Sequence, residues 1–191
     1  MTTRLHLLSS ASTSSVSSVV FAADEPLDQR GRESLSGLSG RLPPYKVVLR
    51  SPALCCAQTA EGLGLTATAE PLLSDFHFGH WAGRSLVEIQ AQAPEAVADW
   101  LQNPHAAPHG GESFADVKAR VGRWMDGLLA GSDTILAITH PFVIRGAIAH
   151  ALGAGPEMFR HIDIAPLTRT KLSGGGGRWK LAALIPLKDE R

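Results

Sequence analysis

The 191-residue chain is divided between two hydrophobic patterns, one typical of strands and one typical of helices. Short apolar runs bounded by turn residues predict five strands, at 5–8, 46–49, 134–139, 168–172 and 179–184. Apolar positions that recur every three to four residues predict six helices, at 28–41, 52–63, 86–93, 96–101, 114–129 and 142–152. Strands that alternate with helices indicate an α/β fold, a sheet with helices on both faces.

Three local signals refine the ends of these elements. Ser51 before Pro52 predicts a helix N-cap with proline in the first helical position. Ser113 predicts a second N-cap, because Asp116 follows three residues later. The four glycines at 174–177 predict a hairpin turn between the last two strands.

Composition limits the class of protein. The length fits one domain, spanning residues 1–191, and 44% hydrophobic residues are ordinary for a globular chain. The 18 basic and 18 acidic residues give zero formal net charge, so we expect neither nucleic acid nor a membrane as a partner. No apolar run approaches the ~18 residues of a membrane span.

The N-terminal segment has some features of a secretory signal. Arg4 precedes an apolar stretch, and Phe21-Ala22-Ala23 could act as a cleavage site. However, residues 9–18 contain seven serines, which interrupt the apolar region, so we expect a cytoplasmic protein. Cys55 and Cys56 are adjacent, a spacing that strains a mutual disulfide, and therefore we expect no disulfide.

His140 is the leading candidate for chemistry. It directly follows the predicted strand 134–139 and precedes the helix 142–152. Open α/β sheets bind their ligands at the carboxyl ends of the strands, which is where His140 lies.

Six segments, in order along the chain, carry a family resemblance. They are the strand 4–8 and five motif-like stretches: 26–31 (like PLTERG), 51–60 (like SPLxRAxQTA), 75–83 (like EIDFGEWEG), 110–113 (GGES) and 139–145 (like SHGGVIR). This pattern resembles the histidine phosphatase (phosphoglycerate-mutase-like) superfamily. The resemblance implies a three-layer α/β/α sandwich with a mostly parallel central sheet, and a phosphatase or mutase activity.

The catalytic positions depart from the resemblance. The family carries Arg-His-Gly after its first strand, with the histidine as phosphate acceptor, whereas this chain has Ser9-Ser10-Ala11. The family's second phosphate-binding arginine falls on Cys55, and its proton-donating glutamate falls on Asp75. The residue after the second histidine is Pro141, which has no backbone N–H for a phosphate oxygen.

Phosphoryl transfer to a histidine needs a nucleophilic imidazole, cations for the phosphate oxygens and an acid for the leaving group. Loss of two charged contacts, each on the order of 2–4 kcal/mol, would slow turnover by roughly three to five orders of magnitude. We therefore expect a silent or severely impaired pseudophosphatase with a ligand-binding or interaction role. The degenerate catalytic set is His140, Asp75, Ser9, Ser10 and Cys55, and the ligand-binding set is Ser9, Ser10, Cys55 and His140.

Several alternatives stay open. His140 and Asp75 could support a weak phosphomonoesterase, and Ser10 or Cys55 could act as a nucleophile with His140 as base. Arg50 and Arg84 could replace the lost cations. A metal-dependent hydrolase could be built from a cluster of suitable ligand types, namely Asp75, His77, His80 and His140.

The expected site has no cofactor and no metal. A small anionic ligand and a second copy of the chain are the partners that the sequence leaves open. If the resemblance holds, Ser10, Cys55, Asp75 and His140 converge at the carboxyl ends of the parallel strands.

Overall fold

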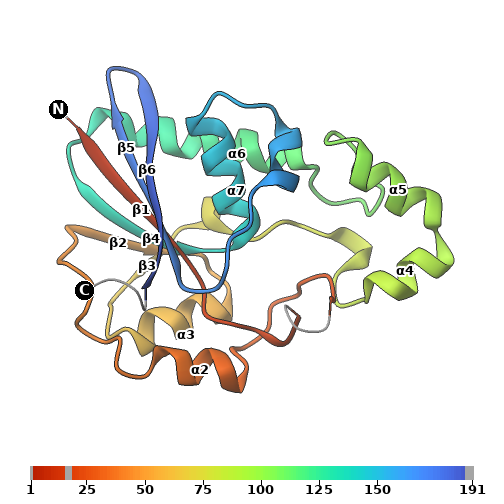
Figure 1. Cartoon of the computed structure of the whole chain (residues 1–191), viewed down its shortest axis with the longest axis horizontal. Coiled ribbons are helices and arrows are strands. Elements are labelled where there is room, and N and C mark those ends of the chain that lie inside the picture. The colour runs from red at the N-terminus through yellow and green to blue at the C-terminus, as the bar shows by residue number, and fades with distance from the viewer. Residues whose placement is uncertain (1, 16–18, 188–191) are drawn as a thin grey trace.

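The computed structural model describes residues 2–15 and 19–187, and a six-stranded sheet forms its centre (Figure 1). The strand order is β3-β2-β4-β1-β5-β6. β1, β2, β3 and β4 run parallel to one another, and β5 and β6 form an antiparallel hairpin at one edge. The strands are β1 (Thr3–Ser9), β2 (Val47–Arg50), β3 (Thr68–Ala69), β4 (Thr134–Thr139), β5 (Thr168–Gly175) and β6 (Arg178–Pro186).

Helices cover both faces of the sheet. The α-helices are α2 (Gln29–Leu35), α3 (Leu54–Gly62), α4 (Leu86–Gln92), α5 (Pro94–Gln102), α6 (Phe114–Gly127) and α7 (Pro141–Ala151). Figure 1 shows α2 and α3 on one side of the sheet, α6 and α7 on the other, and α4 with α5 at the end away from the β5–β6 hairpin. This is the three-layer α/β/α arrangement expected from the sequence.

The alternation of side chains along the central strands divides the core into two parts. Leu5 and Leu7 of β1 belong to the cluster that contains the residues of α6 and α7. Leu8 of β1, with Leu136 and Ile138 of β4, belongs to the cluster on the side of α2 and α3. Because successive strand residues point to opposite faces, β1 and β4 are apolar on both sides, as parallel strands buried between two helix layers must be.

Most predicted elements are present, with shifted ends. β4 and the capping box of Ser113 and Asp116 match the prediction. The helix expected at 28–41 ends at Leu35, and Gly37 and Gly40 follow in the left-handed conformation, which does not continue a helix. The short exposed strand β3 was not predicted.

The start of α3 differs from the prediction. Ser51 is not its N-cap, because the helix begins at Leu54 after the N-cap residue Ala53. The chain turns through Pro52 first, and the hydroxyl of Ser51 accepts from the backbone N–H of Ala53 at 3.3 Å outside the helix.

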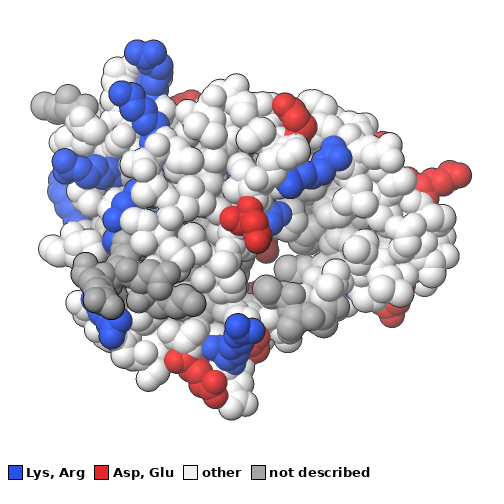
Figure 2. All heavy atoms as spheres, in the orientation of Figure 1, with Lys and Arg blue, Asp and Glu red and all other residues white. Residues whose placement is uncertain are grey.

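The charged side chains are spread unevenly over the face drawn in Figure 2. Basic groups gather over the strand-rich end of the molecule, and a hollow near the centre is bordered by both acidic and basic groups. Within residues 2–15 and 19–187, none of the helices combines the length and the apolar content needed to cross a bilayer.

The loop before α6 depends on a close backbone approach at Gly111. A Cβ atom built there would lie 1.7 Å from the carbonyl oxygen of His77. We expect Gly111→Ala to lower the free energy of unfolding by about 1–3 kcal/mol in chemical denaturation, because the backbone must shift. Gly127→Ala is the matched control: a Cβ at Gly127 meets nothing within 4 Å, so helix propensity should make it neutral or stabilising by up to ~1 kcal/mol. Equal effects of the two substitutions would contradict this explanation.

Candidate functional site

A cavity of about 860 Å³ opens beside the carboxyl ends of β1, β2 and β4. Four of the residues singled out in the sequence line it together: Ser10, Cys55, Asp75 and His140. They come from four separate segments of the chain. The four residues therefore converge on one cavity, as expected. Their position alone does not assign a role to any of them.

His140 is held at both ring nitrogens. It is the residue between β4 and α7, and its side chain is 7% exposed. Nε2 lies 2.8 Å from the hydroxyl oxygen of Ser51, and Nδ1 lies 3.3 Å from Oδ2 of Asp75. The serine follows β2 and the aspartate follows the 3₁₀ turn η1 (Pro71–Leu73), so two other segments fix the orientation of the imidazole.

Both cysteines lie beside this imidazole. They occupy the first turn of α3, and both are buried. The Sγ atom of Cys56 is 3.6 Å from Nε2 of His140. One ligand atom from each of Cys55, Cys56 and His140 lies within 4.8 Å of the other two.

The contacts shift the acidity of these groups in opposite directions. The pKa of the Cys55 thiol is lowered to about 5, because Cys56 donates a hydrogen bond to it and His140 also contacts it, although burial opposes the shift. The pKa of Cys56 is raised well above its usual value by the same hydrogen bond and by burial. Burial lowers the pKa of His140, but the charges of Asp75 and Cys55 outweigh it and raise the pKa. These shifts favour a thiolate at Cys55, whereas Cys56 and His140 retain their protons.

The two serines after β1 have different surroundings. Ser10 is 8% exposed and lines the cavity. Ser9 is fully buried and is not part of the cavity wall: its hydroxyl donates to the carbonyl oxygen of Ala165 at 2.7 Å and accepts from the backbone N–H of Thr168 at 2.9 Å. The expectation that Ser9 faces a ligand is corrected by this placement, because β1 still pairs with the rest of the sheet at that residue.

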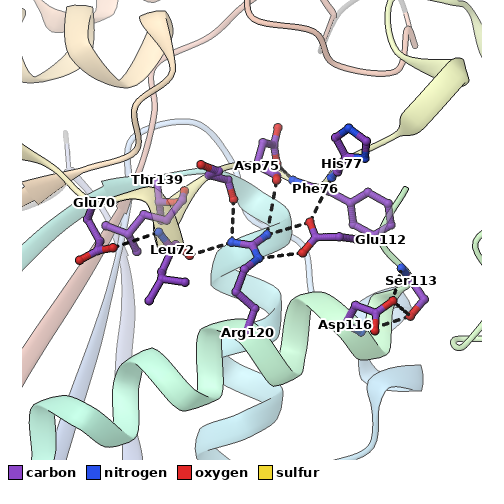
Figure 3. A network of polar contacts seen from close by, with 12 residues as sticks. Glu70, Leu72, Asp75, Phe76, His77, Glu112, Ser113, Asp116, Arg120 and Thr139 are labelled. Atoms are coloured by element: carbon purple, nitrogen blue, oxygen red, sulfur yellow. Dashed lines mark hydrogen bonds and ion pairs between the residues drawn. The ribbon is translucent and has the colours of Figure 1, made fainter. Parts of the chain in front are cut away.

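Two cations that the sequence analysis did not single out reach the cavity. Arg120 of α6 is one of them, and Figure 3 shows its guanidinium surrounded by acceptors. It forms an ion pair with Glu112 at 2.7 Å and donates to the carbonyl oxygens of Leu72 (2.7 Å), Ser74 (3.0 Å) and Asp75 (3.4 Å). Its donors are therefore occupied by the protein itself.

Arg145 of α7 is the second cation, and it keeps a free donor. Its Nη2 lies 3.5 Å from a carboxylate oxygen of Asp163, whose side chain is almost fully exposed. Its Nε is buried and has no hydrogen-bond partner among the residues that the structure describes. Burial lowers the pKa of the guanidinium, and Asp163 opposes that shift.

The cations and histidines proposed from sequence take other positions. Arg50 donates to the carbonyl oxygens of Ser51 and Pro52, and Arg84 donates to Gln92; neither lines the cavity. His77 and His80 are exposed and do not join the group of possible ligands around His140. The segment that carries Asp75, His77 and His80 is not a strand.

Pro141 begins α7 directly after His140, as the sequence analysis assumed. Its fixed backbone angle suits the first helical position, but it offers no N–H to the cavity.

Sequence reasoning did not find the part played by Cys56, Ser51, Arg120 or Arg145. The adjacent cysteines at a strand-to-helix turn were a usable signal for Cys56, and the motif-like stretch 139–145 was one for Arg145. No local pattern distinguishes Arg120 from an ordinary helix-surface arginine, since its backbone acceptors lie 45 to 48 residues away.

Comparison with known proteins identifies the relatives of this chain. The model of the histidine phosphatase superfamily (branch 1) matches residues 13–185. A curated bifunctional protein of Mycobacterium tuberculosis is 34% identical over 121 residues, covering 61% of this chain and 33% of that protein. A glucosyl-3-phosphoglycerate phosphatase of the same species is 33% identical over 103 residues, covering 51% and 46%. The chain thus spans less than half the length of these curated relatives.

Solved structures agree over the whole fold. The mycobacterial glucosyl-3-phosphoglycerate phosphatase superposes with a TM-score of 0.81 at 25% identity, covering 96% of this chain and 98% of that one. The alpha-ribazole phosphatase of Shigella flexneri gives a TM-score of 0.83 at 23% identity, covering 96% of each chain. The second likeness concerns the fold alone.

The thiol contacts predict an unusual reactivity profile. Alkylation of Cys55 by iodoacetamide, followed by mass spectrometry, should rise with pH around a midpoint of about 5, because the thiolate is present above that value. Cys56→Ala removes the donated hydrogen bond and should move the midpoint upward. Cys56→Ser keeps a donor at the same place and should move it less. A midpoint near the ordinary value of 9.0 in the unchanged protein would contradict the interpretation.

Proposed function

Because the chain belongs to the histidine phosphatase superfamily (branch 1), we propose that it is a member with silent or severely impaired phosphatase chemistry, whose cavity binds a small anionic ligand. The single-domain organisation, the cytoplasmic location and any self-association expected from the sequence stay predictions within this proposal.

The observation that carries the proposal is that Ser10 and Cys55, which line the cavity with His140, offer no cation to a phosphate group. The phosphate acceptor of the family is an imidazole, and Ser10 has none. The positions that the family uses for two guanidinium groups hold Ser9 and Cys55, and the hydroxyl of Ser9 is turned into the protein. Without fixed positive charge at these positions, the transition state of phosphoryl transfer loses its main electrostatic support.

The cavity nevertheless keeps the features of a binding site. Its wall combines apolar side chains with polar and charged groups, among them the two arginines and five carboxylates. Concave sites of this mixed kind bind small molecules. Arg145 belongs to this wall, and its guanidinium is paired at 3.5 Å with the carboxylate of Asp163, whose side chain is almost fully exposed and therefore stabilises the cation only weakly. An anionic ligand with an apolar body would contact both the apolar side chains of the wall and the guanidinium of Arg145.

A weak phosphomonoesterase is the competing function. One of the two curated relatives is named as a phosphatase, and His140 with Asp75 keeps a paired acid and base in the cavity. In that case His140 would be needed for whatever hydrolysis the protein performs, which makes the two functions separable by experiment.

We expect hydrolysis of p-nitrophenyl phosphate close to background and no acid-labile, base-stable phosphate label on the protein, because the acceptor imidazole is replaced by Ser10. His140→Asn should leave this residual rate unchanged. A residual rate that His140→Asn abolishes would favour the phosphomonoesterase, and turnover of ~1–10³ s⁻¹ would rule out the silent-enzyme proposal.

The binding proposal is tested with 1-naphthyl phosphate, which joins an apolar ring system to an anion. Calorimetric titration should detect binding to the unchanged protein. Arg145→Gln should weaken it by roughly 10- to 100-fold, because a hydrogen bond from a charged group contributes about 1.5–3 kcal/mol. Arg123→Gln is the matched control, since Arg123 is exposed on α6 outside the cavity wall. Equal affinities for the two variants, or no binding at millimolar concentration, would contradict the proposal.

A further inference from the structure

We propose that Cys55, Cys56 and His140 form a zinc site with one open coordination position toward the cavity. This inference goes beyond the proposed function, because it concerns a metal ion and does not depend on which organic ligand the cavity takes.

The distances between the three ligand atoms fit a zinc ion. The three ligand atoms lie within 4.8 Å of one another, and Cys56 Sγ is 3.6 Å from His140 Nε2. Zinc bonds of about 2.3 Å to sulfur and about 2.0–2.1 Å to nitrogen, arranged tetrahedrally, place sulfur and nitrogen about 3.6 Å apart and two sulfurs about 3.8 Å apart. The cluster therefore needs only a small contraction to hold the ion. Two thiolates and one imidazole are also a ligand set that zinc accepts in sites with an open position.

The contact at the second ring nitrogen of His140 also fits a metal site. Nδ1 of His140 faces Oδ2 of Asp75 at 3.3 Å, which leaves Nε2 directed at the thiols. A histidine that binds a metal commonly donates its other ring N–H to a carboxylate, and this contact fixes the tautomer with the free electron pair toward the ion. On zinc binding, Nε2 would exchange its 2.8 Å contact with the Ser51 hydroxyl for the metal, and the thiol protons would pass to solvent.

The burial of Cys56 favours a metal site over a catalytic nucleophile. Cys56 is fully buried and does not line the cavity, yet it is the thiol with a close contact to Nε2. A thiolate that attacks a substrate must reach it, so the Cys56–His140 contact does not serve nucleophilic catalysis. A metal ion explains why both thiols face one imidazole, and Cys55 and His140, which do line the cavity, place the fourth coordination position on the ligand side.

The position of the site has a consequence for binding. Two thiolates balance the charge of Zn²⁺, so the site as a whole is neutral but keeps a Lewis-acidic position for an oxygen atom. The open coordination position would lie at the end of the cavity that also contains Ser10.

The experiment uses the full chain, reduced and treated with a chelator, and zinc chloride alone as the probe. Competition against a chromophoric chelator should give one ion per chain, and Co²⁺ in place of zinc should give a sulfur-to-cobalt charge-transfer band with tetrahedral d–d bands. Cys55→Ser and Cys56→Ser should each remove part of the charge-transfer intensity and weaken binding at least tenfold. Asp75→Asn, which leaves all three ligands in place, should weaken it by roughly 10- to 100-fold.

His77→Gln and His80→Gln are the control variants, because both histidines are exposed and outside the cluster. They should bind zinc like the unchanged protein. Zinc should also slow alkylation of Cys55 in the unchanged protein and fail to do so in His140→Gln, with thermal unfolding used to verify that each variant is folded. Absence of a charge-transfer band, or binding that depends on His77 or His80 and not on the cysteines, would overturn the proposal. None of these readouts requires turnover or an organic ligand, so failure here is distinguishable from failure of the proposed function.

Discussion

The orientation of one imidazole organises this end of the molecule. His140 ends the central strand β4, and its two ring nitrogens contact Ser51 after β2 and Asp75 after η1. Since β2 and β4 are parallel neighbours, their carboxyl ends must lie side by side, and the chain segments that follow them must share the same space. The polar groups of those segments are buried there and satisfy one another. The cavity, the thiol contacts and the position of Asp75 all follow from this shared edge.

The charged side chains of the cavity differ in how far the protein itself occupies them. The cavity wall contains two arginines, but Arg120 is occupied by Glu112 and by three backbone carbonyls. Arg145 has a spare donor, and it belongs to α7. The groups in contact with Nε2 of His140 are the sulfur of Cys56 and the hydroxyl of Ser51. Sulfur ligands favour a soft or borderline metal ion.

The sequence was sufficient for the framework and for part of the site. Parallel strands that are buried on both faces have continuous apolar runs, so β4 could be recognised over its full length. Ser113 and Asp116 act within one helical turn, and local signals of that kind are readable from spacing alone. Ser51 shows the limit: its spacing suits an N-cap, but a tertiary contact with His140 takes its hydroxyl instead. Cys56 and Arg145 depend in the same way on partners from distant segments.

The contacts of Arg120 have a consequence for how freely the site can change its chemistry. Figure 3 shows that this residue holds the segment 72–75 through main-chain oxygens, which every amino acid provides. The path of the backbone there is consequently insensitive to which side chains it carries. Substitutions at Ser74 or Asp75 can exchange one reactive group for another while α6 continues to fix the loop.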